Sequence, residues 1–300
     1  MHTALSALPA VTLHHISVCH LLGVGGAGTV ERALWGERAL DLKRPLQGAD
    51  GGRDERLWVA LAREAAHGVI VGAHPSARAH TPPLIARLTS ALSLEGGEGE
   101  GALEGLLFEA TEGVSALEEA RQRARGGAPL TPREVGERLE GVCAALSALH
   151  AAGVTHGDLC LSNLIIRDED ASPALIDLGS AWSSPHPYTP TACRARPRYT
   201  SPERAAFERA PRLDAAPPPW ALAERAWSQD AFALGALWHA WVTGAPPDPA
   251  DRPSAAALSA LGWPPRWAEA VEGLMSPSPL SRPRPAEVGA AWTLWGGDWW

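Results

Sequence analysis

The sequence predicts an α+β fold in which a small β-rich N-lobe precedes a larger α-helical C-lobe. The first hundred residues hold short extended runs between glycine-rich turns, whereas longer helical patterns begin at about residue 113. A length of 300 residues, of which 45% are hydrophobic, suffices for one large or two small domains with a buried core. We expect an N-terminal extension at residues 1–19, the N-lobe at 20–112, the C-lobe at 113–296 and a short tail at 297–300.

The N-lobe is expected to be a sheet interrupted by one helix. Its strand candidates are Leu21–Val30, Ala39–Lys43 and Leu106–Glu109. Apolar residues at helical spacing predict a helix over about Glu55–Ala66. Glycine-rich loops separate these elements at residues 47–53 and 95–105.

The C-lobe pattern contains a long helix from Pro132 to about Ala152. Thr131 is a suitable N-cap, proline fits the first helical position, and Gly153 is a stop signal. The other expected elements are short strands at 164–166 and 174–176 and helices at about 230–243 and 285–294. Ten of the 13 tryptophans lie from Trp220 onward, and packing within this lobe explains them better than a ligand surface.

Composition argues against several classes of protein. A net charge of −8 disfavours a nucleic-acid-binding protein, which usually has a basic face. No apolar run is long enough for a membrane helix, and residues 1–20 lack the cationic start of a signal peptide. The four cysteines show no C-x-x-C spacing, which is typical of a reducing compartment. We therefore expect a cytoplasmic protein with neither nucleic acid nor membrane as a partner.

One lysine and one asparagine stand out in this composition. Of the 26 basic residues only Lys43 is a lysine, and Asn163 is the single asparagine. Such depletion indicates a GC-rich coding background in which arginine replaces most surface lysine. Because an ammonium group is a compact point charge and a guanidinium is a planar fork, a retained lysine suggests a site that needs the former.

A glycine-rich segment begins at Gly23. Gly23, Gly25, Gly28 and Val30 form a G-x-G-x-x-G-x-V pattern, whose backbone amides could approach phosphate groups closely. A simple glycine turn explains this pattern about as well when it is taken alone. A dinucleotide site would need a helix directly after the glycines, but residues 29–43 predict strand, turn and strand.

Lys43 ends the second of those strands, which suits a phosphate-binding lysine held by a helix carboxylate. Glu64, in the predicted helix, is the expected partner, and Glu55 is the alternative. The competing interpretation of Glu64 is a solvated helix face.

The segment from His156 to Asn163, followed by Asp177-Leu178-Gly179, resembles the eukaryotic-type (Hanks-type) protein kinases, which are also found in bacteria. The resemblance implies a two-lobed kinase fold, ATP as substrate and Mg²⁺ as cofactor. It implies that Asp158 is the catalytic base, that Asn163 and Asp177 are metal ligands, and that Lys43 binds phosphate. The only lysine and the only asparagine thus both match the family pattern.

Small-molecule phosphotransferases of the aminoglycoside and choline kinase type are similar at the same loop. His156-Gly157-Asp158 matches them better, but the C-terminal half favours the protein kinases. Ser201-Pro202-Glu203 resembles the end of an activation segment, residues 230–235 resemble the start of the family's buried central helix, and Arg282 matches the arginine that pairs with the glutamate. The resemblance spans about residues 20–295.

Four positions depart from the family pattern. Gly157 replaces the arginine that contacts activation-segment phosphate, so we do not expect switching by phosphorylation there. Cys160 replaces a lysine and Arg196 a threonine, two residues that normally bond near the catalytic aspartate. Asp41 replaces an alanine on the adenine-facing side of the strand, where burial of a carboxylate under a base would be costly.

The expected function is transfer of the ATP γ-phosphoryl group to a Ser or Thr hydroxyl of a protein substrate. Glu109 and Ala110 are expected to offer backbone groups to adenine. The departures leave two alternatives: a pseudokinase that acts as a nucleotide-binding or scaffold module, and a small-molecule phosphotransferase.

Overall fold

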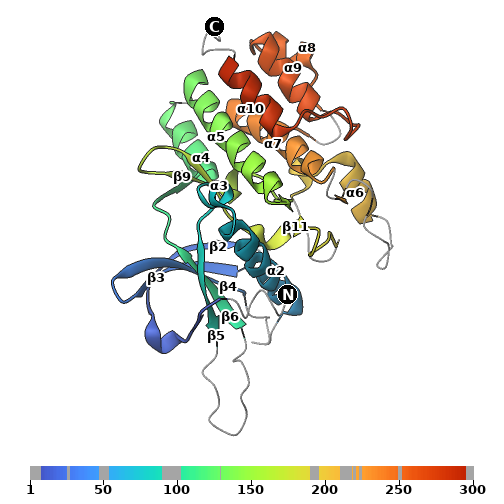
Figure 1. Cartoon of the computed structure of the whole chain (residues 1–300). Coiled ribbons are helices and arrows are strands. Elements are labelled where there is room, and N and C mark those ends of the chain that lie inside the picture. The colour runs from blue at the N-terminus through green and yellow to red at the C-terminus, as the bar shows by residue number, and fades with distance from the viewer. Residues whose placement is uncertain are drawn as a thin grey trace.

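The computed structural model has two lobes (Figure 1). It describes residues 8–25, 28–46, 54–89, 103–128, 130–189, 196–209, 218, 221–222, 225–248 and 252–294. A twisted sheet and helix α2 form the lower lobe of Figure 1, and a group of helices forms the upper one. The predicted α+β fold with a β-rich N-lobe and a helical C-lobe is confirmed.

A six-stranded sheet forms the N-lobe, in the spatial order β1-β5-β6-β4-β3-β2. Its strands are β1 (Ala10–Val11), β2 (Ser17–Gly25), β3 (Gly28–Trp35), β4 (Arg38–Arg44), β5 (Leu84–Thr89) and β6 (Leu103–Glu109). The β1–β5 pair is parallel and the other pairs are antiparallel.

The single strand expected over Leu21–Val30 is wrong, because this segment holds the end of β2 and the start of β3. Gly25 pairs with Gly28 where the chain reverses. A Cβ on Gly28 would overlap the carbonyl group of Arg44 in β4, so this close approach of two strands requires glycine. β2 begins at Ser17 and crosses the expected boundary between residues 19 and 20. The division of the chain into extension, lobes and tail stays a prediction.

The two faces of the sheet have different roles, as strand alternation dictates. One face packs in an apolar cluster made of Val11, Ile16, Ala33, Leu40, Leu42, Ala86, Leu88 and Leu107. Lys43 lies on the other face, directly opposite Leu106 of β6. Leu106 packs with Leu61 and Ala65 of α2 (Glu55–Gly72), so this helix covers the face that carries Lys43.

α2 extends six residues beyond the predicted end at Ala66. The Asp54 side chain caps the helix by accepting the backbone N–H of Arg56 at 2.9 Å. A glycine within a helix is usually destabilising, but Gly68 packs against Leu84 of β5, where a Cβ would come within 2.9 Å of the leucine side chain. The glycine lets the helix lie close to the sheet. The short helix α3 (Pro75–Arg78) follows.

The C-lobe is built mainly from helices. These are α4 (Ala116–Gly126), α5 (Pro132–Ala151), α6 (Pro202–Arg209), α7 (Trp227–Thr243), α8 (Ala255–Ala260), α9 (Pro265–Leu274) and α10 (Pro285–Leu294). Strands β7 (Gly113–Ser115), β9 (Leu164–Arg167) and β10 (Pro173–Leu175) form an antiparallel sheet, and β8 (Val154–Thr155) pairs with β11 (Trp182–Ser183).

The interior of the C-lobe explains most of the helix pattern in the sequence. α5 begins with a capping box between Thr131 and Glu134, at the predicted start. Trp238 of α7 is fully buried and makes edge contacts with Trp267 and Trp292 at ring-centroid distances of 5.5 Å. These tryptophans therefore pack in the core, as expected.

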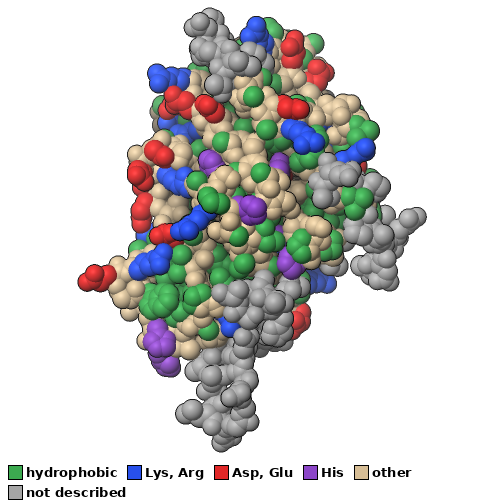
Figure 2. Space-filling view, viewed as in Figure 1, with side chains coloured by type: hydrophobic (Ala, Val, Ile, Leu, Met, Phe, Trp, Pro, Cys, Tyr) green, Lys and Arg blue, Asp and Glu red, His purple; other side chains and the backbone are tan. Residues whose placement is uncertain are grey.

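The surface carries charges of both signs. Figure 2 shows acidic and basic side chains interspersed over the visible face. Among the residues that the structure describes, no helix combines the length and the apolar character needed to cross a membrane.

A buried ion pair connects α6 to the segment before α10. Arg282 Nη1 and Nη2 donate to the two carboxylate oxygens of Glu203 at 2.6 and 2.8 Å, and Arg282 also bonds the carbonyl groups of Ser228 and Ser276. The Arg282 side chain is fully buried. The structure thus contains the Glu203–Arg282 pair that the sequence predicts.

We expect Glu203→Gln to lower the free energy of unfolding at pH 7 by about 3 kcal/mol, because the buried guanidinium of Arg282 loses its charged partner. Burial raises the pKa of Glu203, but Arg282 outweighs this effect and holds the pKa below its ordinary value. A carboxyl whose pKa is lowered by folding stabilises the protein above its unfolded pKa, and this contribution is lost as pH falls through the folded pKa. The difference between wild type and variant should therefore shrink in acid.

Urea unfolding of both proteins over a pH series measures this difference. Glu137→Gln is the control, because Glu137 pairs with Arg133 on the exposed surface and should leave the unfolding midpoint unchanged. A difference between Glu203→Gln and wild type that stays constant into acid would contradict the prediction.

Candidate active site

Lys43 connects the two lobes. Its Nζ lies 2.6 Å from Glu64 Oε2 in α2 and 2.8 Å from Asp177 Oδ1 in the C-lobe. Glu64, and not the solvated helix face of the competing interpretation, is thus a direct partner of Lys43. The alternative partner Glu55 lies nine residues earlier in α2, about 14 Å along the helix axis.

Burial determines the electrostatics of this contact. The side chains of Lys43 and Glu64 are only 11% and 4% exposed. Burial lowers the pKa of Lys43, but the charges of Glu64 and Asp177 outweigh it and raise the pKa above the ordinary lysine value. Burial also raises the pKa of the Glu64 carboxyl, and the ammonium group opposes that shift. Lys43 is therefore a firmly held cation.

Asp177 follows β10 and precedes a single 3-10 turn over Leu178–Ser180. Its backbone is left-handed, with φ of 67°, and its Oδ1 accepts the N–H of Gly179 at 3.3 Å. Burial raises the pKa of Asp177, but Lys43 outweighs this and holds the pKa below its ordinary value. The residue is therefore an ionised carboxylate beside the only lysine of the chain.

Asp158 and Asn163 lie in one loop between β8 and β9, which we call the Asp158 loop (residues 156–163). Asn163 Nδ2 donates to the Asp158 carbonyl oxygen at 2.8 Å and to Asp158 Oδ2 at 3.0 Å. Burial raises the pKa of Asp158, and Arg196 opposes the shift. The loop thus presents a carboxylate whose position is fixed by its neighbouring amide.

The side chains of Asn163 and Asp177 fit a magnesium ion. The Asn163 carbonyl group accepts the N–H of Ile176 at 3.0 Å, which brings Asp177 next to the Asp158 loop. Because Asn163 donates its Nδ2 to Asp158, its amide oxygen is the atom left for a cation. An amide oxygen and a carboxylate are the hard ligands that Mg²⁺ prefers. Among the described residues, this site included, no three His, Cys, Asp or Glu side chains form a metal-binding group, so the candidate ligands here are one amide and one carboxylate.

Asp230, in the first turn of α7, supports the Asp158 loop. Its carboxylate accepts the backbone N–H of His156 at 2.8 Å and that of Gly157 at 2.9 Å, and its Oδ2 lies 2.8 Å from His150 Nε2. Burial raises the pKa of Asp230, but the hydrogen bond and charge of His150 outweigh this and lower it. The sequence predicts Asp230 at the start of a buried helix, but not its contacts with the Asp158 loop. An acidic residue at the start of an apolar helix was the available signal.

Arg196 also contacts the Asp158 loop. Its backbone N–H donates to Asp158 Oδ1 at 3.2 Å, and its Nη1 donates to Asp158 Oδ2 at 2.9 Å. The same Nη1 donates to the sulfur of Cys160. Burial raises the pKa of the Cys160 thiol to about 11, so the thiol is a neutral acceptor. A cation therefore contacts Asp158 although cysteine replaces the lysine of the resembled family.

Only glycine fits at position 157, because the ring of Trp182 lies directly beside it. The glycine has φ of 79°, and a Cβ there would overlap the Trp182 ring and approach the Ser180 carbonyl oxygen to 2.6 Å. Arg204 of α6 donates to the Gly157 carbonyl oxygen at 2.5 Å, and its guanidinium lies 5.4 Å from the ring centre of Trp182. Arg204 of α6 thus lies against position 157, where the family pattern has an arginine and this chain has glycine.

Arg204 also belongs to a contact with the segment that precedes α6. Its Nε donates to Glu208 at 2.7 Å, and the Tyr188 hydroxyl donates to the same carboxylate oxygen at 2.8 Å.

From the N-lobe, Arg63 of α2 donates to the carbonyl groups of Ala181, His186 and Pro187 at 2.8–3.3 Å. The segment is therefore fixed to both lobes. No local pattern in the sequence marks the distant partners of Arg63 and Arg204.

The glycine turn and the lobe junction lie on either side of Lys43. Gly23 and Gly25 lie in the last part of β2, Gly28 begins β3, and Val30 is paired directly with Lys43. Gly26 and Ala27 lie outside the described residues. On the other side, β6 ends at Glu109, whose backbone pairs with Leu40 and whose side chain lies 3.3 Å from Arg38. Ala110 follows at the junction of the lobes.

Asp41 faces inward, with partners of its own. It is paired directly with Arg32, whose Nε donates to Asp41 Oδ1 at 2.8 Å, while Asp41 Oδ2 accepts the backbone N–H of Thr111 at 3.1 Å. Arg32 also pairs with Glu112. Burial raises the pKa of Asp41 against the opposing effects of Thr111 and Arg32. Partners inside the fold therefore offset the expected cost of burying this carboxylate.

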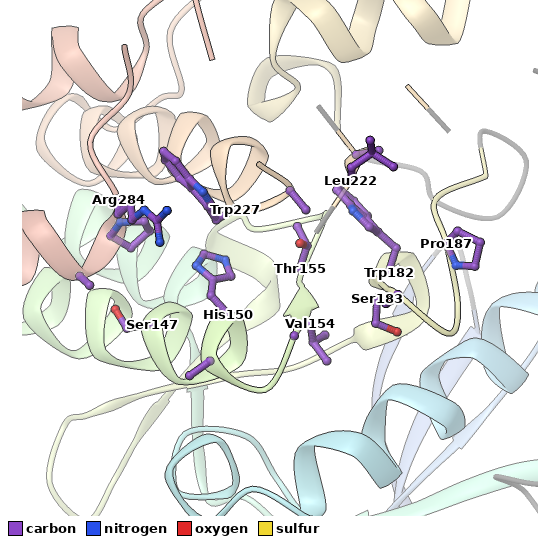
Figure 3. Close-up of a pocket in the computed structure, with 17 residues that line it drawn as sticks. Ser147, His150, Val154, Thr155, Trp182, Ser183, Pro187, Leu222, Trp227 and Arg284 are labelled. Atoms are coloured by element: carbon purple, nitrogen blue, oxygen red, sulfur yellow. The ribbon is translucent and has the colours of Figure 1, made fainter. Parts of the chain in front are cut away.

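A separate cavity of about 540 Å³ lies in the C-lobe, between α5, the β8–β11 pair and the starts of α7 and α10 (Figure 3). The indole rings of Trp182 and Trp227 and the side chain of His150 line it, and the Arg284 guanidinium lies 5.1 Å from the ring centre of Trp227. None of the site residues expected from the sequence lines this cavity.

Comparison with protein families identifies the family of this chain. The family model of the protein kinase domain matches residues 103–261, from β6 to the residue after α8. That range contains Asp158, Asn163 and Asp177 and covers more than half of the chain. No curated protein matches the sequence. The match and the two-lobed structure agree, and the chain belongs to the protein kinase family.

Proposed function

We propose that this protein kinase transfers the ATP γ-phosphoryl group to a serine or threonine hydroxyl of a protein substrate. The observation that carries the proposal is the contact of Lys43 with both Glu64 and Asp177. It brings the cation that would bind phosphate next to the carboxylate that would bind the metal, across the two lobes. Asp158 and Asn163 lie in the adjoining loop, which supports a complete phosphotransfer site.

The nucleotide would bind between the lobes. Lys43 would hold the α- and β-phosphates, with Glu64 fixing its position, and the backbone of the glycine turn would cover the phosphates. Nucleotide contacts would come from Gly23, Gly25, Gly28, Val30, Glu109 and Ala110. Asn163 and Asp177 would hold Mg²⁺, which neutralises charge on the phosphates when bound.

Asp158 would act on the acceptor. Its carboxylate would orient the hydroxyl group and take its proton while the hydroxyl oxygen bonds to the γ-phosphorus and the bond to the β-phosphate oxygen breaks, releasing ADP. Burial raises the pKa of Asp158, which makes it a better proton acceptor. Asn163 keeps the carboxylate in place through two hydrogen bonds.

Arg196 would replace the charge that Cys160 removed. Its guanidinium bonds Asp158 and lies half-exposed beside the Asp158 loop, with the side chain 46% exposed. A fixed cation there would hold Asp158 and attract the phosphoryl group under transfer. We therefore place Arg196 among the positioning residues of the site.

Assembly of the site would not need phosphorylation of the activation segment. Glu208 supplies the negative partner of Arg204, and Arg63 bonds backbone carbonyl groups of the segment directly. These contacts support an arrangement that is complete without a phosphate group, in agreement with the loss of the loop arginine at Gly157.

The departures also support a second candidate, a nucleotide-binding or scaffold module without catalysis. The observation in its favour is that Asp158 and Asp41 each form an ion pair with an arginine of the chain itself.

A small-molecule phosphotransferase is less well supported, because Trp182 accounts for Gly157 and the Glu203–Arg282 pair follows the protein kinase pattern. A cytoplasmic location is supported by the free thiols of Cys19, Cys143 and Cys160.

Asp158→Asn is expected to abolish phosphoryl transfer while ATP binding stays within about threefold, because the carboxylate acts on the acceptor and not on the nucleotide. The measurement is transfer of label from γ-labelled ATP with Mg²⁺ to the chain itself and to a generic protein acceptor.

Label on protein with the wild type, absent with the variant, is the expected result. Equal labelling by both proteins would contradict the role of Asp158. Nucleotide binding without transfer by the wild type would identify the nucleotide-binding or scaffold module. Label on small molecules alone would identify a small-molecule phosphotransferase.

Arg196→Gln is expected to lower kcat by about 10- to 100-fold with little change in KM for ATP, because a charge-assisted hydrogen bond contributes ~1.5–3 kcal/mol. Arg196 opposes the raised pKa of Asp158, so its loss should raise that pKa further. The base must be ionised to accept a proton, and the acid limb of the pH–rate profile should therefore move to higher pH.

The double variant Cys160→Lys/Arg196→Gln tests the same point by rescue, since it returns a cation to the loop position. It should recover much of the lost kcat. Arg198→Gln is the control, because Arg198 bonds the Pro246 carbonyl group and, within the described part of the chain, no residue of the site. A loss of kcat without any shift of the pH profile and without rescue would show that Arg196 is only structural.

A further inference from the structure

The lobe junction contains a charged network that no step of the proposed reaction uses. Asp41 bonds both Arg32 and the backbone N–H of Thr111, and Arg32 continues the network to Glu112. The side chains of Arg32 and Asp41 are only 14% and 16% exposed. A carboxylate, a guanidinium and a backbone amide therefore satisfy each other at the point where β6 leads into the C-lobe.

The network lies where the nucleotide base is expected. Arg32 and Asp41 are a directly paired couple on β3 and β4, and Val30 and Lys43 form another pair two residues away on the same strands. Residues two apart on a strand share one face of a sheet. Asp41, in the middle of β4, is thus on the face of Lys43 and opposite Phe108 of β6, one residue before Glu109, from which the chain continues through Ala110 to Thr111.

The Thr111 amide is the decisive group. A base that bonds the backbone of the junction needs amide N–H groups as donors, and the carboxylate of Asp41 already accepts this one. A neutral ring nitrogen is a weaker acceptor than a carboxylate. A base that took this amide would leave Oδ2 of a largely buried carboxylate without its hydrogen bond, while Arg32 still holds Oδ1, so the exchange is unfavourable.

We propose that the Asp41 carboxylate takes the place of a nucleotide base on the Thr111 amide, so that this kinase binds nucleoside triphosphates through their phosphates with little discrimination between bases. The inference rests on the proposed nucleotide site around Lys43. It makes Asp41 the specificity-determining residue of that site and Arg32 the residue that holds it there.

The test is calorimetric titration of the full chain, with Mg²⁺, by ATP, GTP and inorganic tripolyphosphate. Wild type should bind ATP and GTP within about threefold of each other. Asp41→Ala frees the Thr111 amide and should tighten ATP binding by about tenfold, the equivalent of ~1.4 kcal/mol. Binding of tripolyphosphate should not change, because its contacts with Lys43 remain.

Two further variants keep the test decisive. Arg32→Leu/Asp41→Ala removes both charges, so it leaves no unpaired guanidinium if the single variant fails to fold, and it should give the same gain for ATP. Arg38→Gln is the matched control, because Arg38 forms the neighbouring ion pair of β4 with Glu109 on the exposed surface. It should leave all three affinities unchanged.

The possible failures are distinguishable. Strong preference of the wild type for ATP, with weaker binding in the Asp41 variants, would overturn the inference and leave the proposed function standing. A strong preference for GTP would overturn it as well, since Asp41 would then read the base directly. Absence of binding for all three ligands in every variant would overturn the proposed function and this inference with it.

Discussion

The arrangement of this kinase depends on one ammonium group held between two carboxylates. Lys43 contacts both Glu64 of the N-lobe helix and Asp177 of the C-lobe. Its position therefore fixes how α2 lies against the sheet and where the turn after β10 meets the N-lobe. The contact is buried, and its geometry suits a compact cation with three donors on a flexible stem. A planar guanidinium would match these two partners poorly, which accounts for a lysine in a chain with 25 arginines.

Arginine performs other tasks in the same region, and each suits its forked shape. Arg204 bonds a backbone carbonyl group and a carboxylate at once, and Arg196 bonds a carboxylate and a sulfur. Both lie outside the Asp158 loop in sequence, yet both contact it in the fold. The loop lost two cations of the family pattern, at Gly157 and Cys160, and elements from the activation segment and α6 supply guanidinium groups nearby.

The sequence predicts what depends on local pattern and spacing. The helices α5, α7 and α10 lie close to their expected bounds, because caps, stop signals and apolar periodicity are local. The candidate site residues were found through fixed motif spacing. β1, with two residues, and α6 and α8 carry too little pattern to be recognised. Arg63 and Asp230 were missed for a different reason: their partners lie 118 and 74 positions away, so only the fold reveals them.

Trp182 has a consequence for the history of the Asp158 loop. Its ring occupies the space in which any side chain at position 157 would begin, and the loop backbone there is left-handed. An arginine at that position would require a smaller residue at 182, and that change would remove one of the two aromatic rings, of Trp182 and Tyr188, that lie 5.4 Å from the Arg204 guanidinium. Each single step is unfavourable while the other residue is unchanged. The two positions are therefore epistatic, and control through an arginine at position 157 is accessible only through paired substitutions.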